Sequence, residues 1–149
     1  MSDPTGDLYA KALRLLAMRE HSRHELARKL QSVDADPLSL EALLDGLEQS
    51  GYLDDQRYAE MLVRSSLARG HGPMKIAYAL REKGVATELG SAALALADAD
   101  WQALAAAQRC KKFGKAIPRD AKERARQSRF LAGRGFYLET INAVFHEKC

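Results

Sequence analysis

Residues 73–85, PMKIAYALREKGV, and residues 124–136, RARQSRFLAGRGF, end on the same pattern. In both, a leucine (Leu80 or Leu131) is followed by two unmatched positions, a basic residue, a glycine and an apolar residue. A basic side chain in the last turn and a glycine in the left-handed conformation are typical of a helix C-terminus. Leu30 lies in the matching place about 50 residues before Leu80. The recurrence predicts three tandem copies of one helical unit.

The helix-capping and helix-ending residues between these patterns predict three helices in each unit. Residues that cap or open helices stand before each apolar stripe, as in the capping box formed by Ser22 and Glu25. The other predicted starts are Asp36-Pro37, Asp54 or Asp55, Pro73, Thr87, Asp100-Trp101 and Asp120. The first helix carries Leu8 and Ala12 on one face and is predicted to end near Arg19.

The composition predicts an all-α protein. The chain of 149 residues contains 25 Ala and 21 Leu, which favour helices, but only 4 Val, 3 Ile and 3 Thr, which favour strands. Units of about 50 residues are small for an independent core and should pack on their neighbours. We therefore predict three tandem three-helix units, residues 1–53, 54–99 and 100–149, in an elongated, curved, right-handed array.

Nothing in the sequence predicts a membrane or secreted protein. The longest apolar run, residues 92–97, is far shorter than a membrane-spanning helix. The start Met1-Ser2-Asp3-Pro4 is not followed by the apolar stretch of a signal peptide. The two cysteines, Cys110 and Cys149, suggest neither a disulfide framework nor a metal site, so we expect a cytoplasmic protein.

Charge is concentrated in the third unit. Between residues 109 and 134, ten Lys or Arg residues face two acids, a charge of +8, which leaves −5 for the remainder of a chain whose total is +3. Such a block is typical of a surface that meets nucleic acid or another polyanion, and the alternative is a solvated helix face. Candidate contacts are Arg109, Lys111, Lys112, Lys115, Arg119, Lys122, Arg126, Arg129 and Arg134.

The first half of the chain is acidic and would repel DNA. It suits basic protein surfaces instead, and the candidate protein contacts are Glu41, Asp45, Glu48, Asp54, Asp55 and Glu60.

No catalytic, metal or cofactor site is predicted. The sequence has neither a phosphate-binding Gly-x-x-x-x-Gly-Lys loop nor a dinucleotide-binding Gly-x-Gly-x-x-Gly turn. Ser22 between His21 and His24 resembles a nucleophile cluster, but a helix cap explains it. Capping also explains Asp54-Asp55 better than metal binding does. Tyr52 and Trp101 flank predicted helix starts, where packing is a more common role than stacking on bases.

Four stretches in this order resemble the RecX family, the regulatory proteins of bacterial recombination. They are Arg19-x-x-Ser22-x-x-Glu25-Leu26-x-x-x-Leu30, Gly51-Tyr52-Leu53-Asp54-Asp55-x-x-Tyr58-Ala59, Gly72-Pro73-x-x-Ile76-x-x-x-Leu80-x-x-Lys83-Gly84-Val85 and Arg129-Phe130-Leu131-x-x-Arg134-Gly135-Phe136-x-x-x-x-Ile141. The first unit departs from the family at residues 31–34, where Gln-Ser-Val-Asp replaces the usual Leu-x-x-Lys-Gly ending.

The resemblance implies a non-enzymatic regulator that binds the RecA recombinase, usually as a filament on single-stranded DNA. We expect the protein to be a monomer. Family members lie in the filament groove and limit filament growth, ATP hydrolysis, strand exchange and the SOS response. The resemblance implies indirect or weak contact with single-stranded DNA and no small-molecule substrate. From the residues alone, two alternatives stay open: a stand-alone helical DNA-binding module, such as a transcription regulator, and a helical adaptor without a nucleic-acid role.

Overall fold

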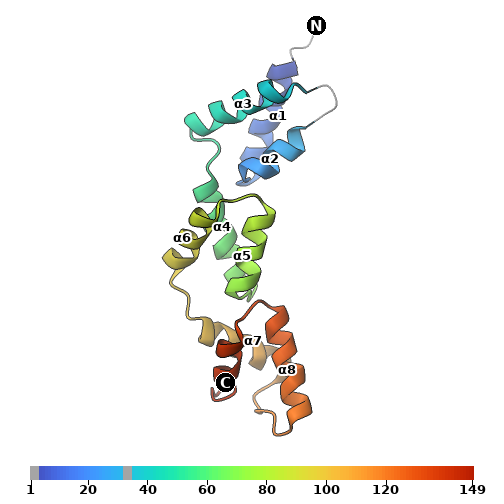
Figure 1. Ribbon diagram of the computed structural model, residues 1–149, viewed down its shortest axis with the longest axis vertical. Helices are drawn as coiled ribbons and strands as arrows, with labels where there is room; N and C mark the ends of the chain where they lie inside the picture. The colour runs from blue at the N-terminus through green and yellow to red at the C-terminus, as the bar shows by residue number, and fades with distance from the viewer. Residues whose placement is uncertain (1–3, 32–34) are drawn as a thin grey trace.

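The computed structural model describes residues 4–31 and 35–149, and every regular element in those ranges is an α-helix. The first triplet comprises α1 (Pro4–Met18), α2 (Arg23–Leu30) and α3 (Pro37–Gln49), and the second α4 (Asp55–Ala68), α5 (Pro73–Glu82) and α6 (Thr87–Ala97). The third comprises α7 (Trp101–Phe113), α8 (Ala121–Gly133) and α9 (Leu138–Val144). The triplets follow one another along the long axis (Figure 1).

This arrangement confirms the all-α, tandem three-helix fold. The boundaries predicted after residues 53 and 99 fall in the connections α3–α4 and α6–α7. The right-handed curvature stays a prediction. Residues 32–34, part of the departure in the first unit, lie outside the described residues.

Each triplet encloses a small apolar core. The matching leucines Leu30, Leu80 and Leu131 are all buried, one in each core, as their period predicts. Trp101 is partly buried against both the second and the third core, so it packs between units.

Capping side chains and glycines close in the sequence explain most helix ends. Ser22 and Glu25 form the predicted capping box. The side chains of Asp36, Asp54, Asp100 and Asp120 each accept a backbone N–H in the first turn of the helix that follows. The helix-ending glycines Gly84 and Gly135 have φ angles of 73° and 98°, the left-handed conformation predicted for them.

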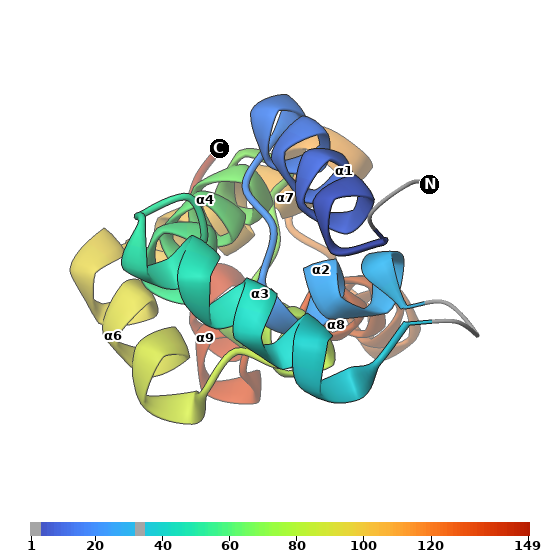
Figure 2. The ribbon, with the colours of Figure 1, turned by 90° about the horizontal axis from the view of Figure 1, so that it is seen from above.

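The second helices of the three units stack end to end. The hydroxyl of Ser22, at the start of α2, donates to the Lys83 carbonyl at the end of α5 over 2.7 Å. At the start of α5, the amides of Gly72 and Met74 donate to the carbonyls of Arg134 and Gly135 beyond α8, at 2.7 and 2.9 Å. The stack α8–α5–α2, called the helix column below, runs along one side of the molecule (Figure 1), and α2 lies over α8 in the end-on view (Figure 2).

The expectation that the cysteines are unpaired was wrong. Cys110 on α7 and the last residue, Cys149, form a disulfide with their Cα atoms 5.9 Å apart. The chain after α9 turns back to α7, which brings together two residues separated by 39 positions. Sequence spacing does not reveal such a return.

Candidate contact surfaces

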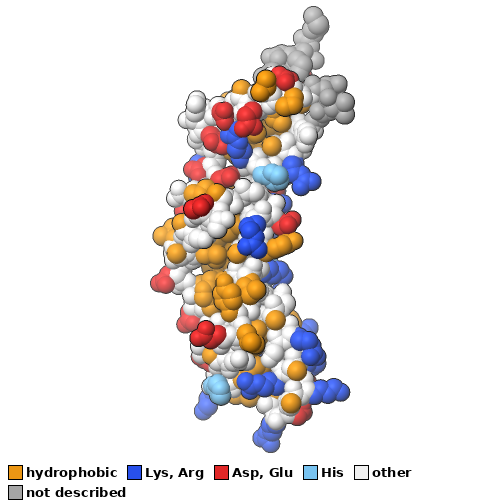
Figure 3. Space-filling model, in the orientation of Figure 1, with side chains coloured by type: hydrophobic (Ala, Val, Ile, Leu, Met, Phe, Trp, Pro, Cys, Tyr) orange, Lys and Arg blue, Asp and Glu red, His pale blue; other side chains and the backbone are white. Residues whose placement is uncertain are grey.

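Seven of the nine predicted basic contacts are exposed side chains of the third unit. They lie on α7, on α8 and in the loop between them: Lys111, Lys112, Lys115, Arg119, Lys122, Arg126 and Arg129. Lys and Arg side chains gather around this end of the molecule in Figure 3. Because these side chains reach into solvent, they can contact phosphate groups without loss of core packing.

An aromatic pair lies within this basic surface. Phe113 and Phe130 meet edge to face, with ring centroids 5.4 Å apart. The Lys112 ammonium lies 5.7 Å from the Phe130 centroid, and the Arg126 guanidinium lies 4.9 Å from that of Phe113. These contacts hold flexible cations beside the rings.

Arg126 is also paired with an acid. It donates to both carboxylate oxygens of Glu123, and the hydrogen bond from Arg126 lowers the pKa of Glu123 to about 2. A phosphate contact by Arg126 must compete with this carboxylate, whereas Lys122 and Arg129 on the same helix are exposed and form no salt bridge among the described residues.

Arg109 was wrongly predicted to be a surface contact. Its side chain is 0% exposed. The guanidinium donates to the Ala116 carbonyl at 3.2 Å and lies within 3.6 Å of both sulfurs of the disulfide. Arg109 therefore holds the α7–α8 loop and the C-terminal residue together.

Arg134 is partly buried at the joint between the second and third units. It donates to the Arg69 carbonyl at 3.2 Å and to the Gln108 side chain at 2.9 Å. The nitrogen Nε is buried without a partner in the described part of the chain. Arg134 therefore links the second and third units, and only part of its side chain is available to a ligand.

The acidic candidates are largely engaged within the molecule. One side chain, Arg23, pairs with Glu41, Asp45 and Glu48 at 2.6, 2.8 and 2.7 Å. Burial opposes the charge of Arg23, but the hydrogen bonds to these carboxylates raise its pKa above the usual value. Because the three acids surround one arginine, part of their negative charge is neutralised within the molecule.

The remaining three acids have separate roles. Asp54 caps α4, and Asp55 accepts the Arg23 backbone amide at 2.7 Å, which links the first two units. Glu60 accepts from the Gln56 side chain over one helical turn. Of the two aspartates, Asp54 is therefore the cap.

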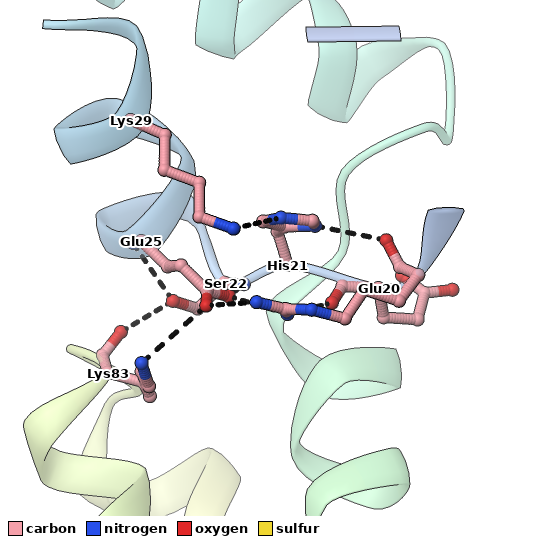
Figure 4. A network of polar contacts seen from close by, with 7 residues as sticks. Glu20, His21, Ser22, Glu25, Lys29 and Lys83 are labelled. Carbon is pink, nitrogen blue, oxygen red and sulfur yellow. Dashed lines mark hydrogen bonds and ion pairs between the residues drawn. The ribbon is translucent and has the colours of Figure 1, made fainter. Parts of the chain in front are cut away.

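A polar network joins the first and second units (Figure 4). Glu25 is 7% exposed and pairs with Arg19 at 2.6 Å and with Lys83 at 3.6 Å. His21 is buried, with Nδ1 3.0 Å from the Arg19 carbonyl and Nε2 2.9 Å from the Lys29 ammonium. These partners fit a neutral ring that donates from Nδ1 and accepts at Nε2.

The pKa values in this network follow from its contacts. Burial would raise the pKa of Glu25, but the hydrogen bond and charge of Arg19, with the charge of Lys83, lower it to about 2. Burial lowers the pKa of His21, and the nearby positive charges of Arg19 and Lys29 add to the effect. The network is therefore stable as a buried carboxylate beside a neutral imidazole.

The described residues contain neither a cluster of metal-ligating side chains nor a membrane-spanning helix. No three His, Cys, Asp or Glu side chains come together as metal ligands in residues 4–31 and 35–149. None of the helices in those ranges combines the length and apolarity needed to cross a membrane.

Comparison with known families gives matches to three consecutive domains. Residues 9–45 match the first three-helix domain of RecX, residues 54–94 the second and residues 98–145 the third. A regulatory protein RecX of Halorhodospira halophila is 46% identical over 133 residues, which cover 89% of this chain and 83% of that protein. One from Acidithiobacillus ferrooxidans is 46% identical over 143 residues, covering 96% and 89%.

Solved structures show the same fold. The crystal structure of RecX from Lactobacillus salivarius superposes with a TM-score of 0.83 at 21% identity, covering 98% of this chain and 97% of that one. A second crystal structure, of a regulatory protein RecX, also gives 0.83, at 23% identity, and covers 97% and 74%.

Proposed function

The chain belongs to the RecX family of regulatory proteins, and on that premise we propose that it binds the RecA recombinase. The target is the filament that RecA forms on single-stranded DNA. Binding inhibits filament growth, ATP hydrolysis and strand exchange, and so modulates recombinational repair and the SOS response. We propose that the protein does this without enzymatic activity, as a cytoplasmic monomer.

Membership of the family is the observation that carries this proposal, and the charge distribution agrees with it. The third unit offers exposed bases to DNA phosphates, while the first unit offers carboxylates arranged around Arg23. Exposed bases suit DNA phosphates, and carboxylates suit basic protein surfaces.

ATP hydrolysis by RecA on single-stranded DNA tests the proposal. The protein should lower the steady-state rate when added to preformed filament and to filament during assembly. Strong inhibition at low ratios of protein to RecA favours capping of filament ends, and a need for near-stoichiometric amounts favours coating of the groove. An unchanged rate at equimolar protein would contradict the proposal.

The exposed bases beside Phe113 and Phe130 also favour a second candidate, a stand-alone DNA-binding module. Such a module should bind bare duplex DNA at physiological salt, and its binding should not depend on RecA. Duplex affinity without any effect on RecA would favour this candidate.

A further inference from the structure

Each of the three stacked helices in the helix column carries the same repeat position of its unit. Arg28, Tyr78 and Arg129 each stand two residues before the matching leucine of their unit. All three are exposed, and Tyr78 presents 57% of its surface to solvent. The helix with the solvent-facing aromatic ring, α5, therefore lies between the two helices that carry these arginines.

Exposed bases continue along the whole column, not only in the third unit. The column carries Arg28 and Lys29 on α2, Lys75 and Arg81 on α5, and Lys122, Arg126 and Arg129 on α8. Lys and Arg side chains recur along this side of the molecule in Figure 3. Its acids are few: Glu25 is buried and paired, Glu123 is paired with Arg126, and Glu82 is exposed beside Tyr78.

The joint between α2 and α5 is hollowed on the same side. A hollow of about 180 Å³ is lined by His24, Glu25, Arg28, Lys29, Glu82 and Lys83. Four of these six residues carry nitrogen groups that can donate to an anion. The basic surface thus continues across the joint instead of being interrupted there.

The backbone dipoles of the three stacked helices are aligned. In the column, the C-terminal end of one helix meets the N-terminal end of the next, so the dipoles of α8, α5 and α2 point the same way. The positive end of this series is the start of α8, inside the most basic unit. At 1.5 Å per residue the three helices span roughly 45 Å, enough for on the order of ten phosphates at the 3.4 Å spacing of a strand.

We propose that the helix column is a track for a single strand of nucleic acid, with bases stacking on Tyr78 and phosphates contacting Arg28, Lys75, Arg81, Lys122 and Arg129. A row of cations interrupted by an exposed aromatic ring is the arrangement that binds single strands without reading their sequence. The track deepens the function proposed above and rests on it for its biological setting. Binding of bare oligonucleotides nevertheless tests it separately.

The first test measures length dependence with fluorescein-labelled thymidine oligomers and the full chain. If the whole column binds the strand, affinity rises with oligomer length until the strand spans about 45 Å. If only the third unit binds, it stops rising near the 20 Å length of α8. A plateau at the shorter length would overturn the track.

The second test reverses charge on α5, away from the third unit. Lys75→Glu with Arg81→Glu should weaken oligomer binding and flatten the slope of log affinity against log salt by about 1.4, because each phosphate contact on a single strand contributes about 0.7. The matched control, Arg14→Glu with Arg64→Glu, reverses two exposed bases on α1 and α4 and should leave the slope unchanged. Equal slopes for the α5 variant and wild type would overturn the track.

The third test addresses stacking. Tyr78→Ala should weaken binding by about tenfold or more, whereas Tyr78→Phe should retain it, because stacking needs the ring and not the hydroxyl. The control Tyr52→Ala removes a similarly exposed tyrosine off the column and should bind as wild type does. RecA inhibition that persists while all oligomer binding is absent would refute the track and leave the proposed function standing.

Discussion

At the scale of single residues, the joints between units depend on glycines that leave no room for a side chain. A Cβ added to Gly84 would lie 2.5 Å from the Cβ of His24 in the first unit. A Cβ added to Gly135 would lie 2.5 Å from the Cβ of Lys75 in the second unit. The helix-ending glycine therefore serves two purposes at each joint: it adopts the left-handed conformation and it lets the neighbouring unit approach.

Gly84→Ala should consequently destabilise the protein more than Gly51→Ala. Both glycines have positive φ, 73° and 81°, but nothing lies within 4 Å of a Cβ at Gly51. The left-handed conformation costs about 1–2 kcal/mol in either variant. Overpacking against His24 should add about 1–3 kcal/mol for Gly84 alone. Urea denaturation measures the difference, and equal losses for the two variants would contradict the close approach.

Glu25 should make the first joint sensitive to acid. Its pKa in the folded protein, about 2, lies below its ordinary value of 4.5, so the unfolded chain binds more protons between these pH values. The stabilisation is complete above pH 4.5 and is lost as the pH falls towards 2. His21, whose folded pKa is lowered by burial, adds a loss that begins below its ordinary value of 6.5.

Glu25→Gln isolates the carboxylate contribution. Wild type should exceed this variant in free energy of unfolding by its largest margin above pH 4.5, and the two should converge as the pH approaches 2. Thermal unfolding across a pH series provides the measurement. A margin that stays constant from pH 7 to pH 3 would show that the pairing with Arg19 and Lys83 does not depend on the ionised carboxylate.

At the scale of helices, the sequence was informative where the interaction is local. A cap involves residues two or three positions apart, so Asp36, Asp100 and Asp120 could be identified from the sequence. Arg109 could not be placed, because its partners Ala116, Gln127 and Cys149 are assembled only when α7, α8 and the C-terminus pack together. The only sequence signal was that Arg109 stands four positions after Ala105, which places both on one face of α7. Both residues are buried.

Contacts between elements could not be predicted either, because their partners are far apart in the sequence. Arg23 gathers acids 18 to 25 residues away, and Ser22 reaches a carbonyl 61 residues away. The capping pattern predicted the role of Ser22 within its own helix but not its bond to the next unit.

The disulfide between α7 and the C-terminus should stabilise the third unit. It closes a loop with a sequence separation of 39, for which the entropy lost by the unfolded chain corresponds to about 2–4 kcal/mol. Cys149→Ser should lower the urea midpoint accordingly, and dithiothreitol should lower the wild-type midpoint to the same value. The reductant should not affect Cys149→Ser itself. A wild-type midpoint that is insensitive to reduction would contradict a structural role for the disulfide.

At the scale of the whole molecule, the two ends differ in how freely their charges are available. The acids of the first unit surround Arg23, whereas Lys111, Lys122 and Arg129 of the third unit extend into solvent. The sequence predicted the asymmetry of charge. Only the structure shows that replacing the acids removes ion pairs, whereas replacing these bases removes none among the described residues.

Replacing Lys111, Lys122 and Arg129 by Glu should therefore weaken binding to DNA-loaded filament while leaving the fold intact. Arg126 is omitted because it pairs with Glu123. Loss of three phosphate contacts should flatten the salt dependence of binding by about 2 in log–log slope. Circular dichroism and urea denaturation should match wild type, since all three side chains are exposed.

The opposite variant, Glu41→Gln with Asp45→Asn and Glu48→Gln, should leave the salt slope unchanged but lower the urea midpoint. Arg23, 23% exposed, loses its three carboxylate partners in this variant. Inhibition of RecA should weaken as well if the first unit meets the recombinase. Should the basic variant inhibit with unchanged potency and salt dependence, the third unit would be only a solvated face. The contact surface would then have to lie on the first two units, where Arg28, Lys29, Lys75 and Arg81 are the exposed bases of the column.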